Sequence, residues 1–358
     1  MDSLTQIALG SAVAVGVMGR RTAVWKAALW GGIAGTLPDL DAFIDHGDDL
    51  LNMVLHRAES HSLIYLTLFS PLLGWVAAQL DRSPPEIRAT ADGSDPRGGG
   101  TWGHWTLALW LVLITHPLLD AMTIYGTQLL LPFTDHPYGV GSLFIIDPAY
   151  TLPLLAGVIA ALALRGTPRG LRWNAYGLLA STAYLAWSVL AQGMVEQQAR
   201  TSLAHQGVQA QRVLVTPAPL QTLLWRVVAL PDDPADPQYL EAYVSVFDQG
   251  RAPRWTAHAR GADLLNLHAG AEPVARLTRF AHGFVKASTT ADGQLRITDL
   301  RMGQEPHYVF SFDTGPLGAV GSRAAAQVSA RPPVGPALRW IGERMWGHDV
   351  PQPWTVTR

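Results

Sequence analysis

Long apolar runs are concentrated in the first 195 residues of the 358-residue chain. A helix needs about 20 apolar residues to cross a bilayer. Runs near that length cover residues 4–19, 23–44, 61–80, 102–120, 149–165 and 173–194. This pattern predicts an α-helical membrane bundle of about six transmembrane helices. Gly31 and Gly35 form a GxxxG pattern in the second run, which is typical of closely packed helices.

The pattern changes after residue 195, where polar residues become frequent. A polar stretch of helical character, EQQARTSLAHQ, leads to the boundary sequence TPAP. Beyond it, TLLWRVVAL and AYVSVF are strand-like, FVKASTTADGQLRITDL contains the DG turn of a β-hairpin, and EPVARLTRFAHGF is helical in pattern. We therefore expect a polytopic membrane domain over 1–195, a connecting helix or linker over 196–215, and a soluble, extramembrane α+β domain over 216–358.

Composition supports a membrane protein and excludes several other classes. Charged residues make up 15% of the chain, whereas about 25% is usual in soluble proteins. The net charge of −2 gives no nucleic-acid footprint. The absence of cysteine excludes disulfides and thiolate metal sites. The first run has no basic residue before its apolar part, so we expect a retained membrane helix and not a secretory signal.

Basic residues predict the orientation of the bundle. Nine Lys or Arg residues fall in the loops after the first, third and fifth runs, and one, Arg57, falls in the other two loops. Under the positive-inside rule the basic loops are cytoplasmic. The loops after the second and fourth runs, and the C-terminal part, should then lie outside. The loop 81–100 is rich in Pro and Gly and is expected to be a flexible linker.

Ionisable side chains stand where the apolar runs end. His116 and Asp120 close the fourth run, and their spacing of four residues places them on one face of a helix. Such groups are costly at membrane depth and usually mark a functional site. Further candidate residues in or beside the outer loops are Asp39, Asp41, His56, Arg57, His61, Thr123, Tyr125, Gln128 and Asp147.

Imidazole and carboxylate groups without thiolates suit a divalent metal such as zinc, iron or manganese in a hydrolytic site. Two neighbouring ions would polarise an ester or phosphoryl oxygen and supply a hydroxide. Arg57 is placed to hold a phosphate or carboxylate. Asp39 or Asp41 would bridge metals, orient a histidine or act as the base.

Each residue taken alone also fits a structural role. His116 and Asp120 fit a hydrogen-bonded pair at a helix end, and Asp39 and Asp41 fit a helix cap after a proline. His56 and His61 fit interfacial histidines. The set as a whole, on one side of the membrane, favours a metal site. His46 and His136 are expected to be solvated loop residues.

The segments MDSLTQ, GTLPDLD, HRAESHS, THPLLD, YGTQLLLPF and FIIDPAYTLPLL resemble the YdjM-type family of membrane-bound metal-dependent hydrolases over residues 1–165. TLLWR and TDLRMG…YVFSF resemble the soluble extension of some members. The family pattern HRG-x-THS is HRAESHS here, with Ala58 for the glycine and Ser60 for the threonine. These departures concern the loop geometry and leave His56, Arg57 and His61 in place.

The resemblance implies metal positions at Asp39, Asp41, His56, His61, His116 and Asp120, with Arg57, Gln128 and Asp147 as accompanying polar positions. We include Asp147 among the candidate ligands and give catalytic roles to Arg57, Asp41 and Gln128. One to three divalent ions are expected, with zinc favoured. Asp2 and Gln6 lie at the outer end of the first run under this topology, which places them within reach of the site, although a solvated terminus also accounts for Asp2.

The function expected is an integral-membrane metal-dependent hydrolase of the bacterial inner membrane. It would act on an ester or phosphoester bond of a lipid or membrane-surface substrate, with the site and the C-terminal domain on the periplasmic face. One alternative is a membrane-anchored binding or scaffold protein whose outer domain recruits a partner. Another is a metal- or proton-coupled transporter, against which no inverted repeat is evident. No nucleic-acid partner is expected, and the sequence indicates no particular protein partner.

Overall fold

The computed structural model describes residues 1–81, 101–210, 212–232, 237–248 and 250–354, and the chain forms two compact units. We call Met1–Phe43, Arg57–Gly139 and Ile145–Trp187 the helical unit. We call Ile44–His56, Val140–Phe144 and Ser188–Arg358 the sheet unit. Nearly all of the loop expected to be a flexible linker, residues 82–100, lies outside the described residues.

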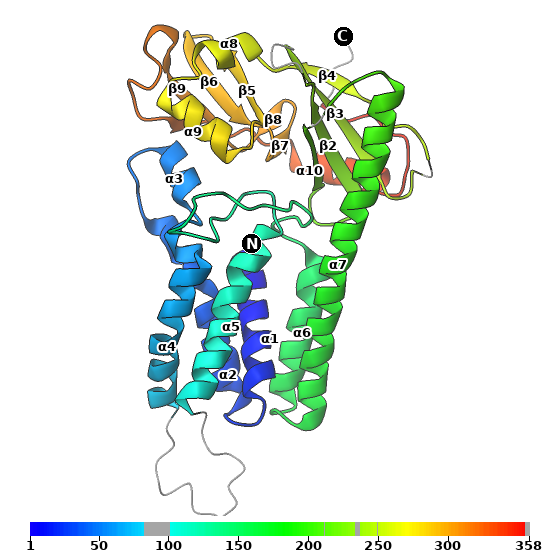
Figure 1. Ribbon diagram of the computed structural model, residues 1–358. Helices are drawn as coiled ribbons and strands as arrows, with labels where there is room; N and C mark the ends of the chain where they lie inside the picture. The colour runs from blue at the N-terminus through cyan, green and yellow to red at the C-terminus, as the bar shows by residue number, and fades with distance from the viewer. Residues whose placement is uncertain (82–100, 211, 233–236, 249, 355–358) are drawn as a thin grey trace, which may run out of the picture. The chain divides into compact units, whose positions relative to one another are not determined.

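The apolar runs of the helical unit form helices (Figure 1). The elements are α1 (Ser3–Met18), α2 (Val24–Thr36), the 3₁₀ helices η1 (Pro38–Phe43) and η2 (Glu59–His61), α4 (Leu63–Leu80), α5 (Trp102–Ala121), α6 (Pro148–Ala163) and the first half of α7 (Pro168–His205). Helix α1 packs against α2, α5 and α6. It is therefore the central element of this unit.

The prediction of a six-helix transmembrane bundle is wrong. Among the described residues, α4 and α7 are long and apolar enough to cross a membrane. Helices α1 and α6 have 16 residues and α2 has 13. At about 1.5 Å per residue these helices are shorter than the ~30 Å hydrocarbon layer. The run 23–44 is divided because α2 ends before Pro38 and the chain continues as η1. Helix α5 has the length, but its Trp, His, Thr and Asp residues reduce its mean hydropathy.

Glycines allow α1 and α2 to approach closely. A Cβ atom at Gly31 would lie 2.2 Å from the carbonyl oxygen of Gly10, and one at Gly35 would lie 2.6 Å from the carbonyl oxygen of Gln6. Both distances are too short for any side chain. The GxxxG pattern therefore corresponds to a tight helix contact, as predicted.

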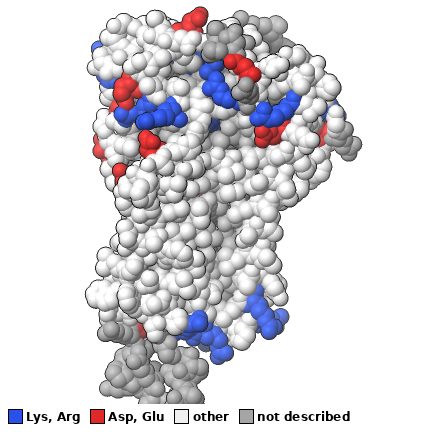
Figure 2. Space-filling model, in the orientation of Figure 1, with Lys and Arg blue, Asp and Glu red and all other residues white. Residues whose placement is uncertain are grey.

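The basic end of the helical unit is held together by one buried carboxylate. Asp81 accepts hydrogen bonds from Lys26 Nζ at 2.9 Å, Thr22 Oγ1 at 2.8 Å and Trp105 Nε1 at 3.2 Å. These contacts link the ends of α2, α4 and α5. Figure 2 shows basic side chains at the α1–α2 and α6–α7 turns and a largely uncharged surface along the helices.

The sheet unit contains two four-stranded antiparallel sheets. The order of the first is β1-β2-β3-β4, with β1 (Arg212–Pro217), β2 (Leu224–Leu230), β3 (Gln238–Ser245) and β4 (Thr256–Ala259). The order of the second is β10-β9-β6-β5, with β10 (Ala326–Gln327), β9 (Ser311–Pro316), β6 (Gln294–Asp299) and β5 (Val285–Thr289). The predicted hairpin at the DG turn is confirmed by the pairing of β5 with β6. Smaller elements are α3 (Asp49–Leu55), α8 (Ala262–Leu267), α9 (Glu272–Phe280), α10 (Val334–Arg344), β7 (Gly303–Gln304) and β8 (His307–Tyr308).

The second half of α7 belongs to the core of the sheet unit. Its buried Ala191, Val195 and Ala199 pack with Trp225 and Val227 of β2. The polar stretch after residue 195 is helical as predicted, because one of its faces carries small apolar side chains that fit against a sheet.

A buried polar network links the elements of the sheet unit. Arg226 of β2 forms an ion pair with Glu241 of β3. Its Nη1 donates to the Leu300 carbonyl at 2.6 Å and its Nη2 donates to the Tyr308 hydroxyl at 3.1 Å. The Tyr308 and Tyr239 hydroxyls are 2.8 Å apart. Removing one partner of a buried ion pair strongly destabilises the folded protein.

We expect Arg226→Ala to destabilise the sheet unit by about 3 kcal/mol or more, because the buried Glu241 would lose its arginine partner and keep only the contact with His258. The measurement is thermal unfolding of the full chain. Arg254→Ala is the control, since Arg254 pairs with Asp349 at the surface and surface pairs contribute little. Equal melting temperatures for the two variants would contradict this account.

Candidate metal centre

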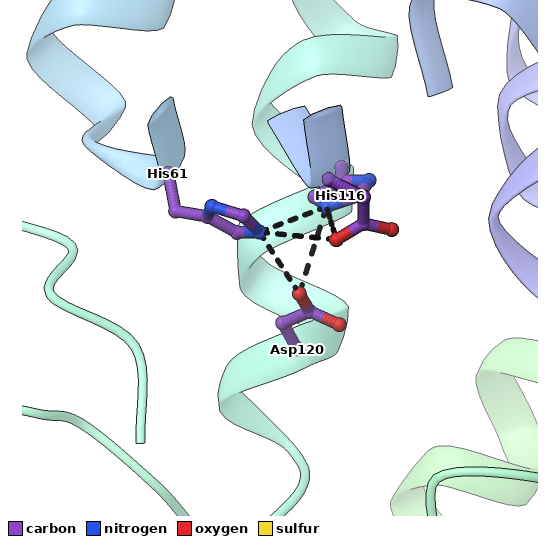
Figure 3. A group of neighbouring side chains, drawn as sticks. His61, His116 and Asp120 are labelled. Carbon is purple, nitrogen blue, oxygen red and sulfur yellow. Dashed lines mark hydrogen bonds and ion pairs between the residues drawn. The ribbon is translucent and has the colours of Figure 1, made fainter. Parts of the chain in front are cut away.

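Four side chains from three elements converge in the helical unit: Asp39 of η1, His61 of η2, and His116 and Asp120 of α5. The α5 pair lies on one helix face, as its spacing predicts, with His116 Nε2 and Asp120 Oδ2 3.5 Å apart. The turn after Thr36 brings Asp39 to this face. Figure 3 shows His61 reaching from its own segment toward the two α5 side chains.

Five of the six distances among these atoms are close to those of a tetrahedral metal site. His61 Nε2 and His116 Nε2 are 3.1 Å apart, and each is 3.4 Å from Asp39 Oδ1. Asp120 Oδ2 is 3.2 Å from His61 Nε2. Zinc bound at about 2.0–2.1 Å would place neighbouring tetrahedral ligand atoms about 3.3 Å apart. The cluster therefore has the donor types and the spacing for one divalent ion.

Burial gives the cluster its electrostatic character. His61, His116 and Asp120 are at most 1% exposed, whereas the Asp39 side chain is 20% exposed. Among the described residues, Asp120 Oδ2 accepts no hydrogen bond of good geometry, although Arg57 Nε lies 3.2 Å away. An acceptor left in this way inside a protein is costly. A bound cation would compensate for that cost.

The ring nitrogen of His116 that faces away from the cluster fixes its tautomer. His116 Nδ1 lies 2.7 Å from the carbonyl oxygen of Gly35. A carbonyl only accepts, so Nδ1 carries the proton and Nε2 presents its lone pair to the cluster. Metal-ligating histidines are commonly oriented in this way. The close approach of α1 and α2 at Gly35 thus also positions a candidate ligand.

His61 is oriented by Ser60 and Asp41. The Ser60 hydroxyl donates to Asp41 Oδ2 at 2.6 Å and lies 2.9 Å from His61 Nδ1. Having donated its proton, the hydroxyl accepts from Nδ1–H, so His61 Nε2 also faces the cluster. Asp41 Oδ2 is 3.5 Å from Nδ1. The structure therefore places Asp41 behind His61 and not among the four convergent side chains.

The carboxylates hold a proton on His61 when no cation is bound. Burial lowers the pKa of His61, but the nearby carboxylates of Asp120, Asp39 and Asp41 outweigh this and raise the pKa to about 9. Burial raises the pKa of Asp39, and hydrogen bonds from the two histidines outweigh it and hold this pKa below its usual range. At neutral pH the negative charges of Asp39 and Asp120 are therefore balanced by positive charge on neighbouring groups.

Arg57 supplies part of that charge from a constrained position. It is 2% exposed, its Nη1 donates to Thr123 Oγ1 at 3.2 Å, and its guanidinium lies 4.8 Å from the centre of the Tyr125 ring. Its φ of 67° is left-handed, which is unfavourable for a residue with a Cβ atom. Asp41 accepts the Arg57 N–H, and the Gln128 N–H donates to the Arg57 carbonyl, so both backbone groups are fixed.

Besides Asp41 and Arg57, three more predicted residues lie outside the group of four. Asp147 caps α6 by accepting from the backbone of Ala149 and Tyr150, and it accepts from the Tyr184 hydroxyl. His56 follows α3 in the sheet unit. Gln128 contacts Arg57 through its backbone. The metal and catalytic roles given to these residues stay predictions.

Two residues near the N-terminus support the cluster. Gln6 Nε2 donates to Asp120 Oδ1 at 3.2 Å, and the amino group of Met1 contacts the same oxygen. Asp2 caps α1 by accepting from the Thr5 N–H. Sequence reasoning noted Gln6 but gave no role to the Ser60 hydroxyl or the Gly35 carbonyl. The position of Ser60 beside a candidate ligand was the available signal, whereas a carbonyl leaves no trace in the sequence.

The helical unit thus defines a membrane-associated class of protein with a buried His/Asp cluster that could bind a metal ion. The chain belongs to the YdjM inner membrane protein family, whose model matches residues 1–195. This confirms the family resemblance inferred from the motifs. Neither the curated proteins nor the solved structures contain a match to this chain.

We expect Ser60→Ala to weaken metal binding about 10–100-fold, because His61 loses the group that fixes its tautomer. Ser60→Thr keeps the hydroxyl and should bind metal like the unmodified protein. Competition with a chromophoric chelator measures both affinities. Equal affinity of the Ala and Thr variants would show that the hydroxyl does not orient His61.

Metal affinity should rise with pH. Below about pH 9 His61 carries a proton that the ion must displace, so affinity should increase up to tenfold per pH unit between pH 6 and 8. Binding at pH 7 should release about one proton for this residue. Calorimetry in buffers of different ionisation enthalpy measures the release. An affinity independent of pH over this range would contradict the assignment.

Proposed function

We propose that this protein is a metal-dependent hydrolase of the inner membrane that cleaves an ester or phosphoester bond in a lipid or membrane-surface substrate. The observation that carries the proposal is the convergence of two imidazoles and two carboxylates at tetrahedral spacing. One of the four side chains, Asp39, is partly exposed, which provides a side from which a substrate can approach.

A divalent ion, with zinc favoured, would supply an activated water and polarise the substrate oxygen when bound. The residues of the chain hold the ligand nitrogens in place and exclude water from three of the four side chains. Arg57 provides a permanent positive charge beside Asp120, which favours an anionic substrate and the charge that develops during hydrolysis. Asp41, through Ser60 and His61, acts in this proposal by positioning a ligand.

We further propose that the cluster faces the periplasm. Arg20 and Arg21 follow α1, and Arg165 and Arg169 lie at the α6–α7 turn. The cluster lies at the opposite end of the helical unit, where α2 ends and α4 begins. Basic residues favour the cytoplasmic side. Helix α7 starts at the basic end and is long enough to cross, so the residues after it belong on the side of the cluster.

The test uses the full chain in detergent, stripped of metal and reloaded with Zn²⁺, Mn²⁺ or Fe²⁺. We expect hydrolysis of a phosphomonoester, phosphodiester or carboxylic ester probe only after reloading. His116→Ala and Asp120→Ala should each reduce the rate at least a hundredfold and weaken metal binding, because each removes a donor atom. The control is His136→Ala, which changes an exposed loop histidine and should leave both properties unchanged.

Two outcomes would contradict the proposal. One is full hydrolytic activity after complete metal removal. The other is full activity and metal content in both the His116 and the Asp120 variants. Metal binding without hydrolysis of any probe, together with metal uptake into proteoliposomes, would instead favour the transporter alternative.

A further inference from the structure

Four large apolar side chains are exposed on two segments beside the cluster, the 3₁₀ helix η1 and the turn around residues 130–133. Phe43 is 85% exposed and Phe133 is 84% exposed, and Leu40 and Leu130 are also exposed. We call these four side chains the apolar rim. Phenylalanine side chains that are nearly fully exposed are unfavourable in water, and exposed apolar patches commonly mark binding surfaces.

The first half of the rim lies on η1 next to Asp39. A 3₁₀ helix has three residues per turn, so Leu40 and Phe43 share one of its faces. Asp39 and Asp41 occupy other faces and contact His61. The same short helix therefore presents a candidate ligand to the cluster and apolar side chains to the exterior.

The second half of the rim is attached to the segment that carries His61. The Leu63 N–H donates to the Leu129 carbonyl at 3.0 Å, and the Ser62 hydroxyl donates to the Leu131 carbonyl at 2.6 Å. Leu130 lies between these two anchored residues, and Phe133 follows shortly after. Since η1 also contacts η2, both halves of the rim adjoin residues 59–63.

The rim continues the apolar surface of α4. This helix is apolar and long enough to cross a membrane, and its exposed Tyr65, Leu68, Leu72 and Trp75 follow helical spacing along one face. Helix α4 begins at Leu63, where the second half of the rim is anchored. Apolar side chains are thus exposed on a candidate membrane span, on the segment anchored at its first residues, and on the helix that carries Asp39, the most exposed of the four cluster side chains.

We propose that the apolar rim binds the hydrocarbon chain of a lipid phosphoester while the phosphoryl group lies at the cluster. The inference rests on the proposed function and specifies its substrate class. Arg57 and a bound ion suit an anionic head group, and the rim suits a long alkyl chain. The surface is reached directly from the bilayer along α4, so the substrate need not leave the hydrocarbon layer completely.

The test compares two non-hydrolysable probes, methylphosphonate and hexadecylphosphonate, on the zinc-loaded full chain in phosphatidylcholine nanodiscs. In the double variant Phe43→Ser, Phe133→Ser, binding of hexadecylphosphonate should weaken about tenfold or more, because two apolar contacts are lost. Binding of methylphosphonate should not change. The double variant Phe43→Leu, Phe133→Leu should retain most of the affinity for the long-chain probe. Leu267→Ser changes a 75% exposed apolar residue of the sheet unit and should alter neither affinity.

Unchanged binding of hexadecylphosphonate to the serine double variant would overturn the role of the rim. If methylphosphonate still bound to the zinc-loaded protein, the proposed hydrolase function would stand without a role for the apolar rim. If neither probe bound to the unmodified zinc-loaded protein, both the rim proposal and a phosphoester substrate would be overturned. Thermal melts of the serine variant check that it remains folded.

Discussion

The charge of two carboxylates held among two imidazoles is the constraint on which the site depends. Asp120 is fully buried and Asp39 is mostly buried, so their negative charge needs compensation from within the protein. Arg57 provides one positive charge and the proton on His61 provides another. A divalent ion at the same position would replace that proton and contact both carboxylates. Arg57 adopts a left-handed backbone conformation beside these carboxylates, and Gln6 donates a hydrogen bond to Asp120.

Helix packing and ligand orientation are coupled in this protein. Gly35 lets α2 approach α1 closely, and its carbonyl fixes the tautomer of His116. One residue separates the end of α2 from Pro38, which begins η1, and η1 carries both Asp39 and the exposed Leu40. The end of α2 near Pro38 thus both keeps this helix short and places Asp39 in the candidate site.

Local sequence patterns predicted the parts of the site that depend on spacing along one element. The i,i+4 relation of His116 and Asp120, the helical stretch after residue 195 and the hairpin at the DG turn are of this kind. Properties that depend on packing between segments were not predictable. His56 and His61 are equivalent in the sequence, yet His61 faces the cluster and His56 follows α3 in the other unit. Apolar length alone predicts too many membrane-crossing helices, because the run 23–44 continues past Pro38 and other apolar runs fold into helices of 16 residues.

The central claim is that His61, His116, Asp39 and Asp120 bind one divalent metal ion. Anomalous diffraction from crystals of the full chain, recorded above and below the zinc absorption edge, tests it most directly. The account predicts one anomalous peak bonded to both Nε2 atoms and to an oxygen of each aspartate, at about 2.0–2.2 Å. Zinc-containing crystals with no anomalous peak among these four side chains would contradict it.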